Sequence, residues 1–355
     1  MSDTTTDPTS GARPPGRAGQ GAFDAQGALV RLATGYRLSQ MLHVAAKLGI
    51  ADLLVGGPKG CEELARLSGA HAPSLYRALR ALAGAGVFAE QADGRFALTP
   101  LAEPLRSAVP GSVRGYIIMQ GEAWIWDAWG RALHSVRTGE PAFTHLHGMD
   151  AFAYLEGHPE AAATFNAGMT GRAASADVAV ARTYDFSGVR TIVDVGGGHG
   201  LLLSTILEAY PAARGILLDL PSVAAGARER IAAAGLVGRC DVIAGDFFAS
   251  VPPGGDCYLL ANVIHDWDDD RAVAILRSCQ RAMADGGRVL IIEAVLPTGN
   301  EPHPGKVGDL QMLVITGGRE RTAAEYRALL TAGGFRSGRV VPTASPVSVV
   351  EGIRE

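Results

Sequence analysis

The sequence predicts an α/β protein with a doubly wound parallel sheet in its second half and a mostly helical region before it. Two observations predict the sheet: beyond residue 185 short apolar runs alternate with helical segments, and the runs lack polar alternation. Strands of that kind are covered on both faces, as in parallel sheets. A third observation, apolar residues at helical spacing over 23–105, predicts the first region.

The first residues, 1–22, are rich in Thr, Pro, Gly and Ser and have no apolar period. Such a segment buries too little surface to offset the entropy lost on ordering, so we expect a disordered tail. Over 23–105 we expect helices, then a short helix, a turn at Gly69, a second helix from Pro73 and two short strands around Asp93-Gly94. This order is a winged-helix outline.

A winged helix has two interpretations. It could bind DNA with 74–82 as recognition helix, or it could serve dimerisation and cover a substrate. The helix offers only Arg77 and Arg80 as cations, and the chain has a formal net charge of -4. These charges favour the second interpretation, and they argue against nucleic acid and membrane surfaces as partners.

Length and composition limit the number of domains, the location and the role of the cysteines. A chain of 355 residues with 47% hydrophobic residues is long enough for about two globular domains. Its apolar stretches fall well short of the roughly 20 residues of a membrane span, and no leader pattern opens the chain, so we expect a cytoplasmic protein. The four cysteines, Cys61, Cys240, Cys257 and Cys279, form no C-x-x-C pair, which predicts buried thiols rather than disulfides or zinc ligands.

Residues 106–180 are also helical in pattern and rich in large side chains. Three of the four tryptophans, Trp124, Trp126 and Trp129, fall here. Most such residues belong to ordinary core, but a pocket for a flat apolar ligand needs walls of this kind. The segment is therefore a candidate lining for an acceptor pocket.

From residue 181 the strands and helices alternate. The expected strands are TIVDVGG, GILLDLP, DVIAGD, CYLLANVI, RVLIIEAVLP and SPVSVVEGI. In an open parallel sheet, ligands bind outside the carboxyl ends of the strands. Candidate residues that cluster at these ends would face one crevice.

The first three strand ends fit a nucleoside. Gly196 and Gly198 allow a tight turn at a helix N-terminus, but Leu201 replaces the third glycine of a dinucleotide fingerprint, which disfavours NAD. Asp219, about 20 residues on, suits a ribose. Asp246 and the adjacent Phe247 suit an adenine. Each aspartate alone could equally be a helix cap or a turn residue, but the three strand ends together all carry residues that suit a nucleoside.

The fourth and fifth strand ends carry His265 and Glu293. A carboxylate beside an imidazole fixes its tautomer and stabilises its cation. Glu320, on a later loop, could do the same, or could simply be an acid in the first turn of a helix. Asp268 or Asp269 is expected to cap the following helix, so the acidic run after His265 does not indicate a metal site.

These motifs, DVGGGHG, the end of GILLDLP, GDFF, IHDW and GGRERT, resemble those of the S-adenosylmethionine-dependent small-molecule O-methyltransferases over residues 25–355. The subgroup includes plant caffeate and hydroxyindole enzymes and bacterial polyketide- and antibiotic-tailoring enzymes. The resemblance implies a Rossmann-like methyltransferase domain over 181–355, a winged-helix dimerisation domain over 23–105 with a helical linker over 106–180, and a homodimer.

The resemblance also implies roles for particular residues. S-adenosylmethionine would contact Gly196, Gly198, Asp219, Asp246 and Phe247. His265 would be the general base, held by Glu293 and Glu320, with no metal. Met169 and Met312 would line the pocket of a small aromatic acceptor, to which we add Phe165 and Trp124 from the helical segment.

One position departs from the family. Many members have a lysine four residues before the histidine, where this chain has Ala261. We expect altered cofactor contacts there, not lost chemistry.

The expected activity is methylation of a phenolic hydroxyl of an aromatic secondary metabolite. Two alternatives stay open: the same fold and cofactor could serve hydroxylation, decarboxylation or a pericyclic step, and, more remotely, the winged helix could belong to a DNA-binding regulator.

Overall fold

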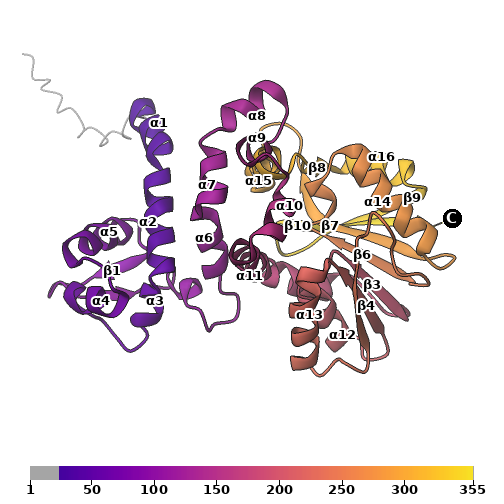
Figure 1. Cartoon of the computed structure of the whole chain (residues 1–355), viewed down its shortest axis with the longest axis horizontal. Helices are drawn as coiled ribbons and strands as arrows, with labels where there is room; N and C mark the ends of the chain where they lie inside the picture. Colours follow the sequence, from indigo (N-terminus) through magenta and orange to yellow (C-terminus); the bar gives the residue numbers. More distant parts are fainter. Residues whose placement is uncertain (1–23, 355) are drawn as a thin grey trace, which may run out of the picture.

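A computed structural model describes residues 24–354, so the expected tail over 1–22 lies outside the described residues. Figure 1 shows a helical part, formed by the first elements, beside a part built on a sheet, with the long helix α11 (Pro159–Thr183) between them. Within 24–354 no helix combines the length and the apolar content needed to cross a membrane.

The first region has the expected order of a short helix, a turn, a second helix and a hairpin. Gly69 ends α4 in a left-handed conformation, and β1 pairs antiparallel with β2. The elements are α1 (Ala25–Thr34), α2 (Tyr36–Lys47), α3 (Ile50–Leu53), α4 (Cys61–Ser68), α5 (Ala72–Gly84), β1 (Phe88–Glu90), β2 (Phe96–Leu98) and η1 (Glu103–Leu105). The apolar residues of α1 are uncovered, since Leu29 and Leu32 are 68% and 78% exposed, whereas α2 buries Ala45 and Ala46.

The middle segment is helical, as expected, and its long last helix leads into the sheet. Its elements are α6 (Arg114–Gly121), α7 (Ala123–Trp129), α8 (Ala132–Thr138), α9 (Ala142–His147), α10 (Ala151–Gly157) and α11. Trp124 and Phe143 form the buried centre of a cluster against which Phe165 and Met169 pack.

The sheet has eight strands in the order β5-β4-β3-β6-β7-β10-β9, with β8 paired to β7. Its strands are β3 (Thr191–Val195), β4 (Arg214–Asp219), β5 (Cys240–Ala244), β6 (Cys257–Ala261), β7 (Arg288–Leu296), β8 (Arg321–Thr322), β9 (Phe335–Pro342) and β10 (Val347–Arg354). β5, β4, β3, β6 and β7 run parallel. The chain order reverses between β3 and β6, which is where open α/β sheets bind ligands.

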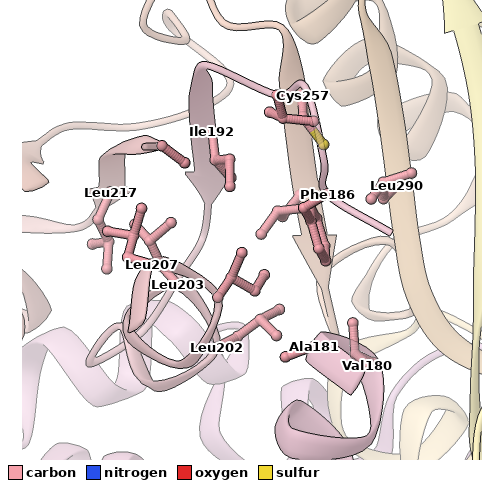
Figure 2. Close-up of a cluster of buried hydrophobic side chains, with 14 of the residues drawn as sticks. Val180, Ala181, Phe186, Ile192, Leu202, Leu203, Leu207, Leu217, Cys257 and Leu290 are labelled. Atoms are coloured by element: carbon pink, nitrogen blue, oxygen red, sulfur yellow. The ribbon is translucent and has the colours of Figure 1, made fainter. Parts of the chain in front are cut away.

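Helices cover both faces of the sheet. They are α12 (Leu201–Ala209), α13 (Pro221–Ala233), α14 (Asp269–Ala282), α15 (Gly305–Gln311) and α16 (Ala323–Ala332), with a 3-10 turn η2 (Ile264–Asp266) and a π turn η3 (Met312–Thr316). On one face Val180 of α11 and Leu203 of α12 pack against Ile192 and Leu217 (Figure 2). The absence of polar alternation in the strands is explained by this double cover.

The strand prediction needs correcting at the end of the chain. β9 was not expected, because FRSGRVVP mixes polar and apolar residues, and β9 and β10 are antiparallel to their neighbours. A strand at the edge of the sheet keeps one side open, so it need not be apolar throughout. The cysteines are free; Cys61 is half-buried, whereas Cys240, Cys257 and Cys279 are buried as expected.

Candidate active site

The carboxyl ends of the parallel strands bring the predicted residues to one edge of the sheet, with two corrections. β6 ends at Ala261, and His265 lies in the turn η2 that follows. Glu293 lies within β7, which continues to Leu296, and not at its end. Asp268 caps α14 by accepting from the backbone N–H of Arg271 at 2.8 Å.

The glycine turn after β3 is tight, because Gly196 and Gly198 have φ of +69° and +57°. Their amide groups are already used: Gly196 N donates to Leu218 O at 2.8 Å and Gly198 N to Asp219 Oδ2 at 2.7 Å. The amides of Gly196 and Gly198 are therefore not free to bind a ligand, and these two glycines offer it a backbone surface without side chains. Each oxygen of Asp219 accepts one backbone N–H and keeps a lone pair for a ligand.

A buried carboxyl beneath this turn was not singled out by sequence. Asp194 is 1% exposed, and neither of its oxygens has a hydrogen-bond partner among the described residues. Burial, together with the neighbouring carboxyls of Asp177 and Asp219, raises the pKa of Asp194 to about 8. The sequence signal was its place directly before the glycines at a strand end.

Asp246 and Phe247 lie on the loop after β5. Asp246 accepts from the backbone N–H of Phe248 at 2.8 Å, so it also stabilises its own turn. The rings of Phe247 and Phe248 lie 6.2 Å and 4.9 Å from that of Trp267, which in turn stacks on Phe152 of α10 at 5.5 Å. Aromatic side chains thus connect this loop to the helical segment.

His265 is buried, and Nδ1 of its ring lies 2.8 Å from Glu320 Oε1. Burial alone would lower the pKa of His265, but the carboxylates of Glu293, Glu320 and Asp266 outweigh it and raise the pKa to about 9. An acceptor partner at Nδ1 makes that nitrogen the donor and leaves Nε2 to accept a proton.

Glu293 holds the backbone of this turn instead of the ring. Its Oε1 accepts from the N–H of Val263 at 3.0 Å and of His265 at 3.1 Å, and its Oε2 accepts from the Tyr326 hydroxyl at 2.6 Å. The sequence left open which glutamate orients the imidazole, and in the structure it is Glu320. Tyr326 was missed, because a tyrosine at helical spacing gives no signal of this contact.

Among residues 24–354, His265, Glu293 and Glu320 form the one group of three side chains with metal-ligating atoms close together, within 4.8 Å. Glu293 uses both oxygens to accept from three donors, so it is engaged in holding the turn. The cluster thus consists of one imidazole with a carboxylate at its Nδ1 and a second carboxylate that binds the backbone of its turn.

Most of the predicted acceptor-pocket residues belong to one apolar cluster. Trp124, Phe165 and Met169 share the cluster described above, to which Val314 and Ile315 of η3 also belong. Met312 is the first residue of η3. Ala261 is half-buried at the end of β6, opposite Ile292 of β7, and brings no charge to the position where many family members have lysine.

A charge-removing substitution tests the ion pair directly. Replacing Glu320 with Gln should lower the pKa of His265 from about 9 toward the ordinary 6.5, because a carboxylate favours the imidazolium. Titration of the His265 ring by NMR in the cofactor-free protein measures this. Glu325→Gln, on α16, is the matched control, and an unchanged His265 pKa in Glu320→Gln would refute the assignment.

The pH dependence of the unfolding free energy gives a second test of the contact between His265 and Glu320. Because the pKa of His265 is higher in the fold than in the unfolded chain, the pair stabilises the fold fully below about pH 6.5 and loses this contribution as pH rises through about 9. The difference in unfolding free energy between the wild type and Glu320→Gln should shrink over that range.

Comparisons with known proteins agree with this geometry. The family model for the O-methyltransferase domain matches residues 129–336, and that for the O-methyltransferase dimerisation domain matches 30–107. A phenazine O-methyltransferase of Lysobacter antibioticus is 50% identical over 331 residues, which cover 93% of this chain and 97% of the relative.

Two further relatives show which kinds of molecule and which acceptor atoms appear in the names of similar proteins. One is an O-methyltransferase from neocarzinostatin biosynthesis, whose crystal structure holds S-adenosyl-L-homocysteine and 1,4-dihydroxy-2-naphthoic acid. It is 37% identical to this chain, with a TM-score of 0.78, and the match covers 94% of this chain and 100% of that structure's chain. A phenazine-1-carboxylate N-methyltransferase of Pseudomonas aeruginosa is 35% identical, covering 88% of this chain and 92% of its own length.

Proposed function

Because the chain belongs to the O-methyltransferase family, we propose that it methylates a phenolic hydroxyl of an aromatic secondary metabolite, with S-adenosylmethionine as methyl donor and His265 as general base. The observation that carries this proposal is the buried contact of 2.8 Å between His265 Nδ1 and Glu320 Oε1 at the carboxyl edge of the sheet. The bound donor supplies a methyl group on a sulfonium.

The residues at the glycine turn fit such a nucleoside. Asp219 has lone pairs left for ribose hydroxyls, and Asp246 with Phe247 would take the adenine. The unpartnered carboxyl of Asp194 fits an ammonium group, since a cation would satisfy its two buried oxygens. Gly196 and Gly198 would allow close approach.

Proton removal from the acceptor is the task assigned to His265. A phenol of pKa about 10 and an ordinary imidazole of about 6.5 differ by about 3.5 units, so full deprotonation would cost about 5 kcal/mol. For a neutral ring with the pKa of about 9 that it has without cofactor, the difference falls to about one unit, or about 1.4 kcal/mol, and a bound cation would widen it again. Glu320 would keep Nδ1 protonated, and Glu293 would add negative charge that stabilises the imidazolium.

The raised pKa has a second consequence. The base must be neutral, and in the cofactor-free protein the ring is charged at pH 7. A cation bound in the crevice would lower that pKa, because like charges repel. Turnover should therefore increase with pH until the ring is neutral.

The acceptor class rests on the apolar side of the crevice. Trp124, Phe165, Met169 and Met312 would form walls for a flat ring system. The relative named as a phenazine O-methyltransferase and the one solved with 1,4-dihydroxy-2-naphthoic acid support a fused-ring acceptor for this chain. Dimerisation of two copies is proposed from the match over 30–107, and a cytoplasmic location remains a prediction from sequence.

The test is a panel of hydroxylated phenazines, naphthoates and quinones incubated with donor carrying a labelled methyl group. A product that gains one labelled methyl on oxygen, with release of S-adenosylhomocysteine, is the expected result. Methylation on nitrogen would contradict the phenolic assignment. A product altered without gaining methyl would favour the non-methylating alternative, against which the intact His265 and Glu320 pair argues.

A further inference from the structure

We propose that Arg321 is a positioning residue for the reaction: its guanidinium clamps the turn that carries His265 to the loop that carries Glu320, and so sets the orientation of the imidazole. This rests on the proposed role of His265 as base. Arg321 itself is 0% exposed, and its guanidinium contacts backbone carbonyl groups and Asp269, so it acts through the turn.

The contacts of Arg321 are concentrated on backbone carbonyl groups of that turn. Its NH1 donates to Ile264 O at 3.2 Å and its NH2 to Trp267 O at 2.8 Å, on either side of His265. NH1 also donates to the carbonyl of Arg319 in its own loop at 3.1 Å. One planar group thus joins the two segments, a geometry that lysine cannot reproduce.

Asp269 fixes the guanidinium in turn. Its Oδ1 accepts from Arg321 Nε at 3.1 Å and from NH2 at 2.8 Å. A fully buried charge is costly unless it is paired and hydrogen-bonded, and here the donors of Arg321 face the Asp269 carboxylate and three carbonyl groups. These contacts compensate the charge, and the same contacts hold the turn.

Side chains from other segments bind the backbone of the turn that carries His265. The turn follows Asn262, which has a φ of +54°, an uncommon conformation for a residue other than glycine. Glu293 accepts the N–H groups of Val263 and His265 on one side, while Arg321 donates to carbonyl groups on the other. Glu293 and Arg321 therefore bind the N–H and the C=O of one shared peptide group, between Ile264 and His265, and each binds one further backbone group of the turn.

The loop that supplies Arg321 also supplies the ring's partner. Glu320 precedes Arg321 directly and contacts His265 Nδ1, while its own N–H donates to Asp309 Oδ1 at 2.8 Å. Because adjacent residues hold the backbone and the ring of one histidine, a shift at Arg321 would change both the position of the ring and its distance from Glu320.

The experiment compares Arg321→Lys with Arg319→Lys. Arg319 lies in the same loop and also binds Asp269, at 2.6 Å, but its side chain is 46% exposed and reaches Asp269 and Glu325 instead of the carbonyl groups of the turn. In Arg321→Lys we expect kcat to fall about 10- to 100-fold, since small misplacements of reacting groups cost that much. Binding of S-adenosylhomocysteine should stay within about three-fold, and Arg319→Lys should match the wild type.

NMR titration of His265 in the cofactor-free variants separates positioning from general damage and needs no acceptor. We expect the pKa of His265 in Arg321→Lys to shift by about one unit or more toward its ordinary value as the Glu320 contact loosens. If Arg321→Lys does not fold, Asp269→Ala, at a half-exposed carboxylate, takes its place with smaller effects in the same directions.

A folded variant with wild-type kcat and an unchanged His265 pKa would overturn the proposal, as would a loss of kcat with the pKa unchanged. If the proposed function is wrong, the results differ: the wild type would methylate no acceptor. The shift in the His265 pKa would still show whether Arg321 sets the position of the ring.

Discussion

Replacing His265 with alanine should reduce turnover by about 10²- to 10⁴-fold, the range that positioned general bases contribute. The ring is buried, and Glu320 and Glu293 supply it with negative charge on two sides. Alanine leaves these two carboxylates without the imidazolium that compensates them. Neither can replace the base, because Glu293 is engaged by three donors and Glu320 lies behind the ring at Nδ1.

The measurement is the single-turnover rate on an acceptor identified by the labelled-methyl panel, with S-adenosylhomocysteine binding measured separately. His71→Ala is the control, because His71 is exposed and its ring contacts Ser74. Wild-type binding with lost turnover is the expected pair of results. Turnover within a few-fold of the wild type would refute His265 as base, and would favour an acceptor nitrogen that attacks without losing a proton first.

Much of the crevice could be predicted from sequence because strand ends are strong signals. Apolar runs that stop at Asp219 or before His265 define carboxyl ends, and parallel strands bring those ends to one edge. The cover of both faces could also be predicted from the strand composition. Residues far apart in the chain could thus be assigned to one site without coordinates.

The pairing within the site could not be predicted, because it depends on a short turn. The sequence does not reveal the backbone conformation between Ala261 and His265. That conformation points the N–H groups of Val263 and His265 toward Glu293 and the imidazole ring toward Glu320. For the same reason the sequence did not single out Arg321, which is buried in the structure. Hydrogen-bond partners among neighbouring acids are set by tertiary geometry.

The second large effect is expected at Gly318, two residues before Glu320. A Cβ at this position would lie 2.0 Å from the carbonyl oxygen of His265, 2.4 Å from the carbonyl carbon of Asp266 and 2.5 Å from the backbone nitrogen of Trp267. All three are backbone atoms of residues 265–267, so no side-chain rotation relieves the overlap. The loop and the turn must move apart.

Gly318→Ala should therefore lower kcat by about 100-fold, since a misplacement of about 1 Å is enough, and lower the unfolding free energy by about 1–3 kcal/mol through overpacking. Urea unfolding and single-turnover rates measure the two effects. Gly238→Ala is the matched control: no atom lies within 4 Å of its added Cβ, and we expect unchanged activity and up to about 1 kcal/mol of added stability.

Wild-type activity in Gly318→Ala would mean that the loop can separate from the turn without cost to the reaction. That result would contradict the argument that Gly318, Glu320 and Arg321 form one unit around His265. A loss of activity with stability unchanged would instead place the effect in the orientation of the imidazole, because the overlap is confined to residues 265–267. The His265 pKa should then fall as it does in Glu320→Gln, since separating the loop from the turn weakens the same carboxylate contact.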